Sequence, residues 1–125
     1  MIDASKIEQD FPFVKCGLEC GKGWNQLIYD LCAELKQIGF NSDVLQIKEK
    51  FGGLRYYIDL YPTELEEKIN TIINEYEKKS FTTCESCGSD KGKLLNQNYW
   101  YRVRCPECNE KEGRQYTLAT DMDMP

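Results

Sequence analysis

The chain has no histidine among its 125 residues. Histidine is the commonest general base, and it completes the Ser-His and Cys-His pairs that activate nucleophiles. Its absence removes the usual machinery of most hydrolases, so we expect a protein that is not an enzyme. Carboxylates such as Glu49 and Asp59 leave an enzyme as an open alternative, although isolated acids on strands usually belong to a solvated face.

The sequence also lacks a long apolar run and an excess of basic residues. No stretch approaches the ~20 apolar residues of a membrane-spanning helix, and the N-terminus is polar, so we expect a cytoplasmic protein. The formal net charge is −5, so no global positive field attracts a phosphate backbone. In the reducing cytoplasm, the seven cysteines are expected as metal ligands and buried thiols, not as disulfides.

Four of the cysteines form two C-x2-C pairs, Cys84 with Cys87 and Cys105 with Cys108, and 17 residues separate the pairs. This spacing is typical of zinc sites, because each pair presents two thiolates on one side of a tight turn. Four thiolates close a tetrahedral coordination shell and leave no open position for catalysis. We therefore predict one structural Zn2+ ion.

The predicted zinc module covers residues 81–116. Two short strands are expected at 93–95 and 99–103, around a polar reversal. If Pro106 opens a helical turn, the module is of the treble-clef type, and otherwise it is a zinc ribbon. Gly88 and Asn109 are residue types that accept the left-handed backbone often needed after such pairs. Residues 117–125 show no periodicity and are predicted to be a flexible tail.

The other three cysteines, Cys16, Cys20 and Cys32, raise the question of a second metal site. Cys32 lies on an apolar helical stripe, where a free cysteine behaves as a small hydrophobic residue. No histidine is present to act as a fourth ligand. We therefore predict that these three thiols bind no metal.

Residues 1–80 are predicted to form a separate α+β unit. A helix is expected over 24–38, where the apolar stripe comprises Trp24, Leu27, Ile28, Leu31, Cys32, Leu35 and Ile38. Gly39 follows the last apolar position and suits a left-handed helix end. Trp24, the largest member of the stripe, is expected to be buried.

An antiparallel hairpin is expected over 44–60, because apolar and polar residues alternate there on both sides of a glycine-containing turn at 50–53. The apolar positions of this alternation are expected to face the core: Leu45, Ile47, Leu54, Tyr56 and Ile58. A second helix is expected over 64–79, opened by a capping box that starts at Thr63. Helix, hairpin and helix together predict an α+β fold in which both helices cover one face of a small sheet. Since two strands alone are marginal, a third could come from 11–14 or from a partner chain.

The chain combines both cysteine pairs with the segments Cys20-Gly21-Lys22-Gly23-Trp24 and Lys48-Glu49-Lys50-Phe51-Gly52-Gly53-Leu54-Arg55-Tyr56-Tyr57. In these features, over roughly residues 16–110, it resembles a family of small bacteriophage and prophage proteins of uncharacterised function. Members often have a histidine as the last zinc ligand, where this chain has Cys108. The resemblance implies a phage-associated origin and brings no activity, substrate or catalytic residue.

The segment from Lys48 to Arg55 concentrates charge and aromatic character around the turn. A plain hairpin reversal explains the glycines. Alternatively, Phe51 and Arg55 project from a rigid turn as anchors for a partner, since aromatic residues and arginine are the usual interface hot spots. Phe51 and Arg55 are therefore our candidate partner-binding residues.

Two functions follow from these observations. The first is a non-catalytic zinc-binding protein that modulates a host factor through protein–protein interaction. The alternative is a nucleic-acid-binding zinc finger, in which cations contact phosphates and aromatic rings stack on bases. For nucleic-acid binding, the candidate phosphate contacts are Lys91, Lys93, Arg102 and Arg104. The candidate stacking residues are Tyr99, Trp100 and Tyr101.

Overall fold

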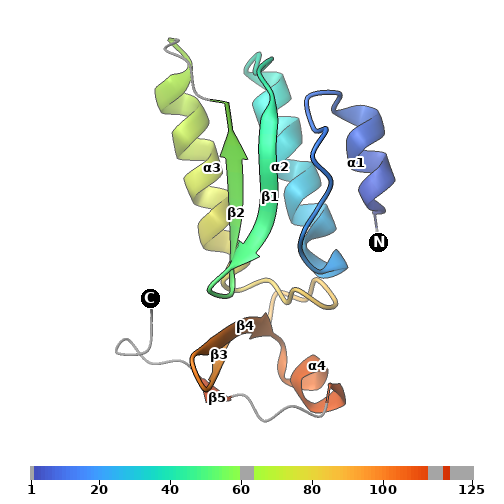
Figure 1. Ribbon diagram of the computed structural model, residues 1–125, viewed down its shortest axis with the longest axis vertical. Coiled ribbons are helices and arrows are strands. Elements are labelled where there is room, and N and C mark those ends of the chain that lie inside the picture. The colour runs from blue at the N-terminus through green and yellow to red at the C-terminus, as the bar shows by residue number, and fades with distance from the viewer. Residues whose placement is uncertain (1, 60–63, 113–116, 119–125) are drawn as a thin grey trace.

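The computed structural model describes residues 2–59, 64–112 and 117–118 (Figure 1). The fold is α+β, with helices and two small antiparallel sheets. The helices are α1 (Ala4–Asp10), α2 (Asn25–Gln37), α3 (Glu66–Ser80) and α4 (Pro106–Lys111), and a short 3-10 turn (Lys22–Trp24) leads into α2. The strands are β1 (Val44–Lys50), β2 (Gly53–Ile58), β3 (Lys93–Gln97), β4 (Trp100–Arg104) and β5 (Thr117–Leu118).

The two sheets lie at different ends of the molecule (Figure 1). The β1–β2 hairpin has α2 and α3 on one face, and α1 lies beside α2. The second sheet, in the order β4-β3-β5, lies with α4 beyond the closed end of the β1–β2 hairpin. The turn of the first hairpin therefore meets the second sheet.

The main core lies between the helices and the inner face of β1–β2. Helix α2 buries most of the stripe predicted from its sequence, and Gly39 ends it with a φ of +92°, as predicted. The largest buried side chains contributed by α2, α3 and the turn before α2 are Trp24, Ile28, Leu31, Leu35, Ile69, Ile73 and Tyr76.

The β1–β2 hairpin pairs Lys50 with Gly53 and Lys48 with Arg55. An irregularity between Val44 and Gln46 interrupts the alternation near the start of β1. Val44 is consequently buried, whereas Leu45, which the sequence assigned to the core face, is 58% exposed. The assignment of Leu45 is wrong because a β-bulge reverses the inside–outside pattern locally.

Both edges of this hairpin are covered, the β2 edge by side chains of α3 and the β1 edge by the backbone of the segment before α2. On the β2 edge, the amides of Leu54 and Tyr56 donate hydrogen bonds to Ser80 Oγ (2.9 Å) and Glu77 Oε2 (3.0 Å) of α3. On the β1 edge, residues 14 and 19 form isolated parallel bridges with residues 44 and 48. The third strand expected from 11–14 is thus reduced to single bridges, and helix side chains satisfy the opposite edge.

The hairpin turn consists of Phe51 and Gly52, which have φ values of +52° and +88°. This is the conformation that two-residue hairpin turns require. Of the two glycines in the predicted turn, Gly52 has a positive φ, whereas Gly53 is the first residue of β2 and the other left-handed position is taken by Phe51. A Cβ atom at Gly53 would lie 2.4 Å from the Phe81 ring, so this glycine makes room for an aromatic side chain.

Other segments also differ from the sequence expectations. Helix α1 was not predicted, because Ile7 is its only buried residue. Helix α3 begins at Glu66, without a side-chain cap, and the proposed cap Thr63 lies outside the described residues. The predicted tail begins with β5, which pairs with β3, and 119–125 lie outside the described residues.

In the part of the chain that is described, no helix has the length and apolar character to cross a bilayer.

Candidate metal centre and its surroundings

Four cysteine sulfurs converge beside the second sheet and α4. The Sγ atoms of Cys84, Cys87, Cys105 and Cys108 all lie within 4.8 Å of one another, and those of Cys87 and Cys105 are 3.7 Å apart. A tetrahedral site with Zn–S bonds of about 2.3 Å places its sulfurs about 3.8 Å apart. The cluster is therefore compatible with one zinc ion. Among residues 2–59, 64–112 and 117–118, no other such group of metal-binding side chains occurs.

The first cysteine pair lies on a turn closed by its own backbone. Gly88 N donates to Cys84 O at 2.8 Å, and Cys84 N donates to Ser89 O at 2.9 Å. Gly88 has a φ of +81°, which confirms the left-handed backbone predicted at this position. The turn therefore presents both sulfurs toward the same side.

The second pair lies at the start of α4. Cys105 immediately precedes this helix, and Pro106 occupies its first turn. Proline suits this position, because backbone N–H groups of the first turn have no acceptor within the helix. Asn109 N donates to Cys105 O within the helix, at 3.0 Å. The left-handed conformation predicted for Asn109 is wrong, because α4 continues to Lys111.

Backbone hydrogen bonds and neighbouring thiols shift the pKa values within the cluster in opposite directions. Burial raises the pKa of the Cys84 thiol, but backbone N–H groups of Cys105, Cys87 and Ser86 donate to its sulfur and lower the pKa to about 7. At Cys108, burial and then the neighbouring thiols raise the pKa well above its usual value. Adjacent thiolates repel one another, and a bound dication removes this repulsion.

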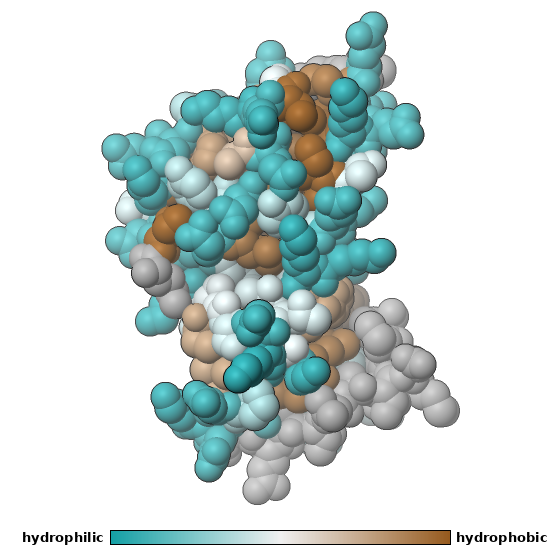
Figure 2. Space-filling model, turned by 180° about the vertical axis from the view of Figure 1, so that it is seen from behind, coloured by the Kyte–Doolittle hydropathy of each residue, from teal (hydrophilic) through white to brown (hydrophobic). Residues whose placement is uncertain are grey.

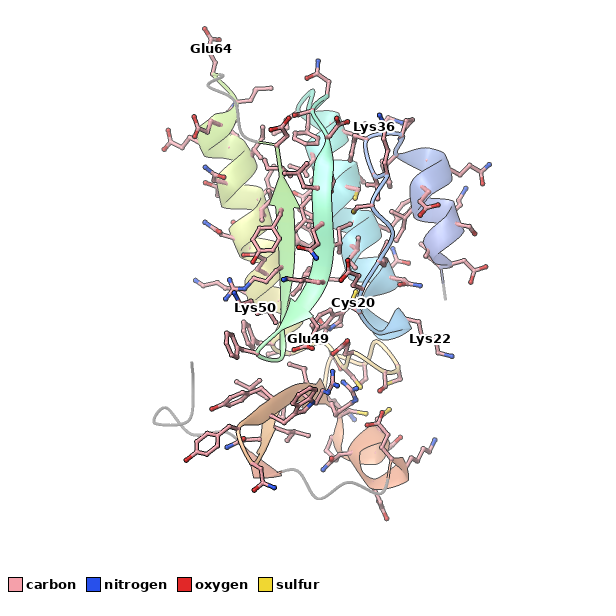
Figure 3. The ribbon with its side chains drawn as sticks, in the orientation of Figure 1. Cys20, Lys22, Lys36, Glu49, Lys50 and Glu64 are labelled. Atoms are coloured by element: carbon pink, nitrogen blue, oxygen red, sulfur yellow. The ribbon has the colours of Figure 1, made fainter. Side chains whose placement is uncertain are left out.

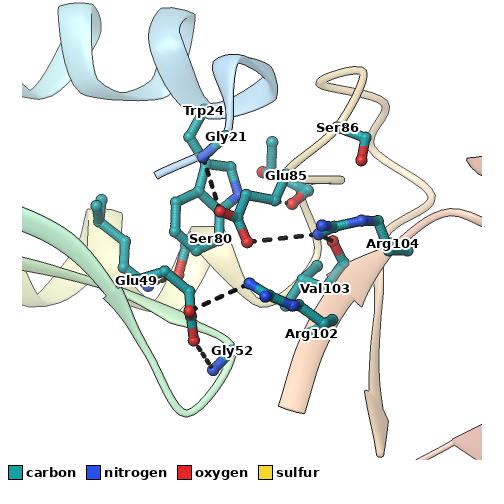
Figure 4. A network of polar contacts seen from close by, with 12 residues as sticks. Gly21, Trp24, Glu49, Gly52, Ser80, Glu85, Ser86, Arg102, Val103 and Arg104 are labelled. Atoms are coloured by element: carbon teal, nitrogen blue, oxygen red, sulfur yellow. Dashed lines mark hydrogen bonds and ion pairs between the residues drawn. The ribbon is translucent and has the colours of Figure 1, made fainter. Parts of the chain in front are cut away.

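The first cysteine turn is joined to the segment before α2 by a buried polar network (Figure 4). Glu85, which lies between two of the cysteines and is 3% exposed, accepts a hydrogen bond from Gly21 N at 2.7 Å and pairs with Arg104 at 3.4 Å. Trp24 Nε1 donates to Thr83 O at 2.8 Å. We call these contacts the seam.

Gly21 and Gly23 belong to the seam because they allow two backbones to approach closely. A Cβ atom at Gly23 would lie 2.4 Å from Cys84 O, and one at Gly21 would lie 2.4 Å from Glu85 O. Gly23 N donates to Glu85 O at 2.8 Å. The Cys-Gly-Lys-Gly-Trp segment thus provides the surface on which the first cysteine turn rests.

A second connection lies at the tip of the β1–β2 hairpin. Glu49 accepts a hydrogen bond from Gly52 N at 2.7 Å and pairs with Arg102 of β4 at 3.3 Å (Figure 4). A Cβ atom at Gly52 would lie 2.6 Å from Leu94 Cδ1, so the tip rests directly on the second sheet. The structure therefore gives Glu49, considered above as a catalytic acid, a role in joining the β1–β2 hairpin to the second sheet.

The three remaining cysteines lie on α2 (Cys32) and on the segment between α1 and α2 (Cys16 and Cys20), against the main core. The Cys32 thiol is buried and lies 3.1 Å from the Tyr56 hydroxyl. Burial raises the pKa of both Cys20 and Cys32 to about 12. Among the residues that the structure describes, none of these three thiols belongs to a cluster of metal-binding side chains. That Cys16, Cys20 and Cys32 bind no metal stays a prediction.

The tips of the two hairpins meet at a shallow surface hollow, which we call the tip hollow. It is lined by Glu49, Lys50, Phe51, Tyr99, Trp100 and Tyr101. Three of its aromatic residues are well exposed: Phe51 (48%), Trp100 (56%) and Tyr99 (84%). The helical side of the molecule is, by contrast, mostly hydrophilic (Figure 2).

Arg55, the second predicted anchor, does not line the tip hollow. It lies on the outer face of β2, where its guanidinium pairs loosely with Glu77 at 3.9 Å. The signal that sequence analysis missed is the aromatic pair Tyr99 and Trp100, which it considered only for base stacking. The structure brings Phe51 together with these residues.

The residues suggested for nucleic-acid binding are only partly available. Arg102 pairs with Glu49, and Arg104 pairs with Glu85 and Glu112. Tyr101 is buried. Lys91 and Lys93 are exposed. Two of the four cations are therefore already neutralised by carboxylates, and one of the three aromatic rings cannot stack on a base.

Comparison with known proteins does not identify a relative of this chain. No protein-family model, curated protein or solved structure matches the chain. The cysteine cluster, the seam and the tip hollow are therefore the observations from which a function is inferred.

Proposed function

We propose that the protein is a non-catalytic zinc-binding protein that acts by binding another protein through the tip hollow. The cysteine cluster supports the first half of this proposal, since its Sγ separations fit four thiolates around one Zn2+. Such a shell has no open position, so the metal stabilises the fold without taking part in chemistry.

The proposed zinc module is a treble-clef type of finger. A cysteine turn, the β3–β4 hairpin and a second cysteine pair at the start of α4 follow one another in that order. A zinc ribbon has no such helix after the second pair. The short helix α4 therefore favours the treble clef.

The observation that carries the proposal is the backbone at the two hairpin tips. Phe51 has a φ of +52° and Tyr99 a φ of +66°, a region that costs non-glycine residues about 1–2 kcal/mol each. Asparagine or glycine would form either turn with less strain. Both strained residues are exposed aromatics that line the same hollow, which indicates that the side chains serve a purpose other than folding.

We propose a host protein as the partner and the host cytoplasm as the location, because the chain resembles bacteriophage and prophage proteins. Exposed aromatic side chains held on rigid turns are typical interface anchors. Protein is favoured over nucleic acid because carboxylates already neutralise Arg102 and Arg104.

The test replaces Phe51 by asparagine, which suits the first position of this turn. We expect Phe51→Asn to keep or raise the free energy of unfolding by about 1 kcal/mol, because the left-handed strain is relieved. Binding to the partner should weaken about 30-fold, which corresponds to the hot-spot threshold of about 2 kcal/mol. Thermal melting and a quantitative binding assay measure the two effects separately.

The partner for this assay is obtained by photo-crosslinking in host cells. A photoreactive phenylalanine analogue at Phe51 should form a covalent adduct with one protein. The same analogue at Leu45, which is even more exposed than Phe51 but lies at the other end of β1, should not. A Phe51→Asn variant that unfolds easily, or that binds the captured protein as well as the wild type does, would refute the proposal.

A further inference from the structure

The outer face of the β1–β2 hairpin adjoins the tip hollow and carries several cations. Lys48 and Arg55 are directly opposite each other in the register, so their side chains project from the same face. Lys50 lies at the end of β1, beside the hairpin tip (Figure 3). We call Lys48, Lys50, Arg55 and Tyr57 the cationic face.

Aromatic rings hold two of these lysines in place. Lys48 Nζ lies 5.7 Å from the centre of the Tyr57 ring, and Lys50 Nζ lies 5.7 Å from that of Phe51. Such contacts orient an ammonium group without neutralising its charge. The lysines therefore keep their charge available at the surface.

The acids that surround the cationic face are already engaged. Glu77 pairs with Arg55 and accepts a hydrogen bond from Tyr56 N, and Glu49 points to Gly52 and Arg102. Glu19 accepts a hydrogen bond from the Gln46 side chain at 3.3 Å. Among the residues that the structure describes, no carboxylate lies within 4.0 Å of the Lys48 or Lys50 ammonium groups.

Like charges placed directly opposite each other destabilise a hairpin, so the pairing of Lys48 with Arg55 does not serve folding. It lies beside Phe51, whose left-handed backbone is also unfavourable. The like-charge pair and the strained backbone both lower stability at the same surface, which indicates that these residues are kept for binding. On a chain with a net charge of −5, a locally positive face of this kind suits an anionic ligand.

We propose that the tip hollow and the cationic face together bind an acidic segment of a partner protein that carries at least one large apolar side chain. This inference rests on the proposed function and names the chemistry of its partner. Carboxylates of the segment would meet Lys48 and Lys50, and its apolar side chain would enter the hollow between Phe51 and Trp100. Single-stranded nucleic acid is less suitable, because a phosphate backbone requires a longer row of cations.

The experiment selects ligands from a displayed library of random 12-residue peptides on the zinc-loaded full chain. Peptides that also bind the Phe51→Asn variant are discarded. The retained peptides are expected to be enriched in Asp and Glu and to contain Phe, Tyr, Trp or Leu. Replacing Lys48 and Lys50 together by glutamine should weaken the best peptide about tenfold.

The matched control replaces Lys22 and Lys68 by glutamine. It changes the net charge equally at two exposed lysines outside the hollow and the cationic face, and it should leave affinity unchanged. Melting curves exclude folding defects in either double variant. A 12-nucleotide oligothymidylate serves as the nucleic-acid probe.

The possible outcomes separate the inference from the proposed function. Phe51-dependent peptides that are neutral or basic would overturn the inference and leave the proposed function intact. Oligothymidylate binding that depends on Phe51, without any Phe51-dependent peptide, would overturn both in favour of nucleic acid. If neither probe binds in a Phe51-dependent manner, the proposed function itself fails.

Discussion

Removing the metal with a chelator is expected to unfold the segment from Cys84 to Glu112. Structural zinc contributes an apparent binding free energy of about 10–16 kcal/mol at neutral pH, which exceeds the total stability of most small domains. Apart from the cysteines, the buried apolar side chains in this segment are few: Leu95, Tyr101 and Val103. They cannot replace a metal centre, so this segment should lose its fold.

Two-dimensional NMR before and after chelation measures this effect. Amide signals of β3, β4 and α4 should collapse to random-coil positions, while those of α2 should keep their dispersion. Cys108→Ser should reproduce the loss, whereas Cys16→Ser should change neither the metal content nor the spectrum. Unchanged signals from β3 and β4 after verified removal of the metal would show that zinc does not support the fold.

The Trp24→Ala variant is expected to lose about 3–5 kcal/mol of stability, as is usual when a buried aromatic side chain is truncated. Trp24 has no exposed surface and packs among the core residues of α2. Its indole also donates a hydrogen bond to Thr83 O, so the truncation leaves a seam carbonyl without this donor. Denaturant unfolding of the zinc-loaded protein measures the loss.

The chain offers a matched control in its only other tryptophan. Trp100 is 56% exposed, and Trp100→Ala should change stability by about 0.5 kcal/mol or less. Trp24→Phe keeps an aromatic six-membered ring but removes the N–H group and part of the indole volume, so its loss of stability should be smaller than that of Trp24→Ala. Equal stability of Trp24→Ala and Trp100→Ala would mean that Trp24 is not part of the core.

The features that sequence analysis predicted well are local ones. The stripe of α2, the Gly39 helix end and the spacing of the four cysteines each depend on residues that are close in sequence. Local periodicity and backbone preference determine such features directly. The bulge that exposes Leu45 is local as well, but an apolar alternation does not reveal one inserted residue.

The seam could not have been predicted, because its contacts join residues far apart in sequence. Glu85 accepts its hydrogen bond from Gly21, 64 positions earlier. The glycines at 21 and 23 were visible as a motif, but their purpose becomes clear only when the cysteine turn lies against them. The same holds for Phe51, which was identified as an anchor without its neighbours Tyr99 and Trp100.

We propose a closed site in which four cysteine sulfurs bind one zinc ion and thereby stabilise the segment from Cys84 to Glu112. Metal analysis combined with zinc X-ray absorption spectroscopy of the natively purified protein tests it most directly. We predict one zinc per chain, with four sulfur ligands at about 2.3 Å and no nitrogen or oxygen ligand. A natively purified and folded protein without zinc, or a zinc ion with an oxygen ligand in its shell, would contradict the claim.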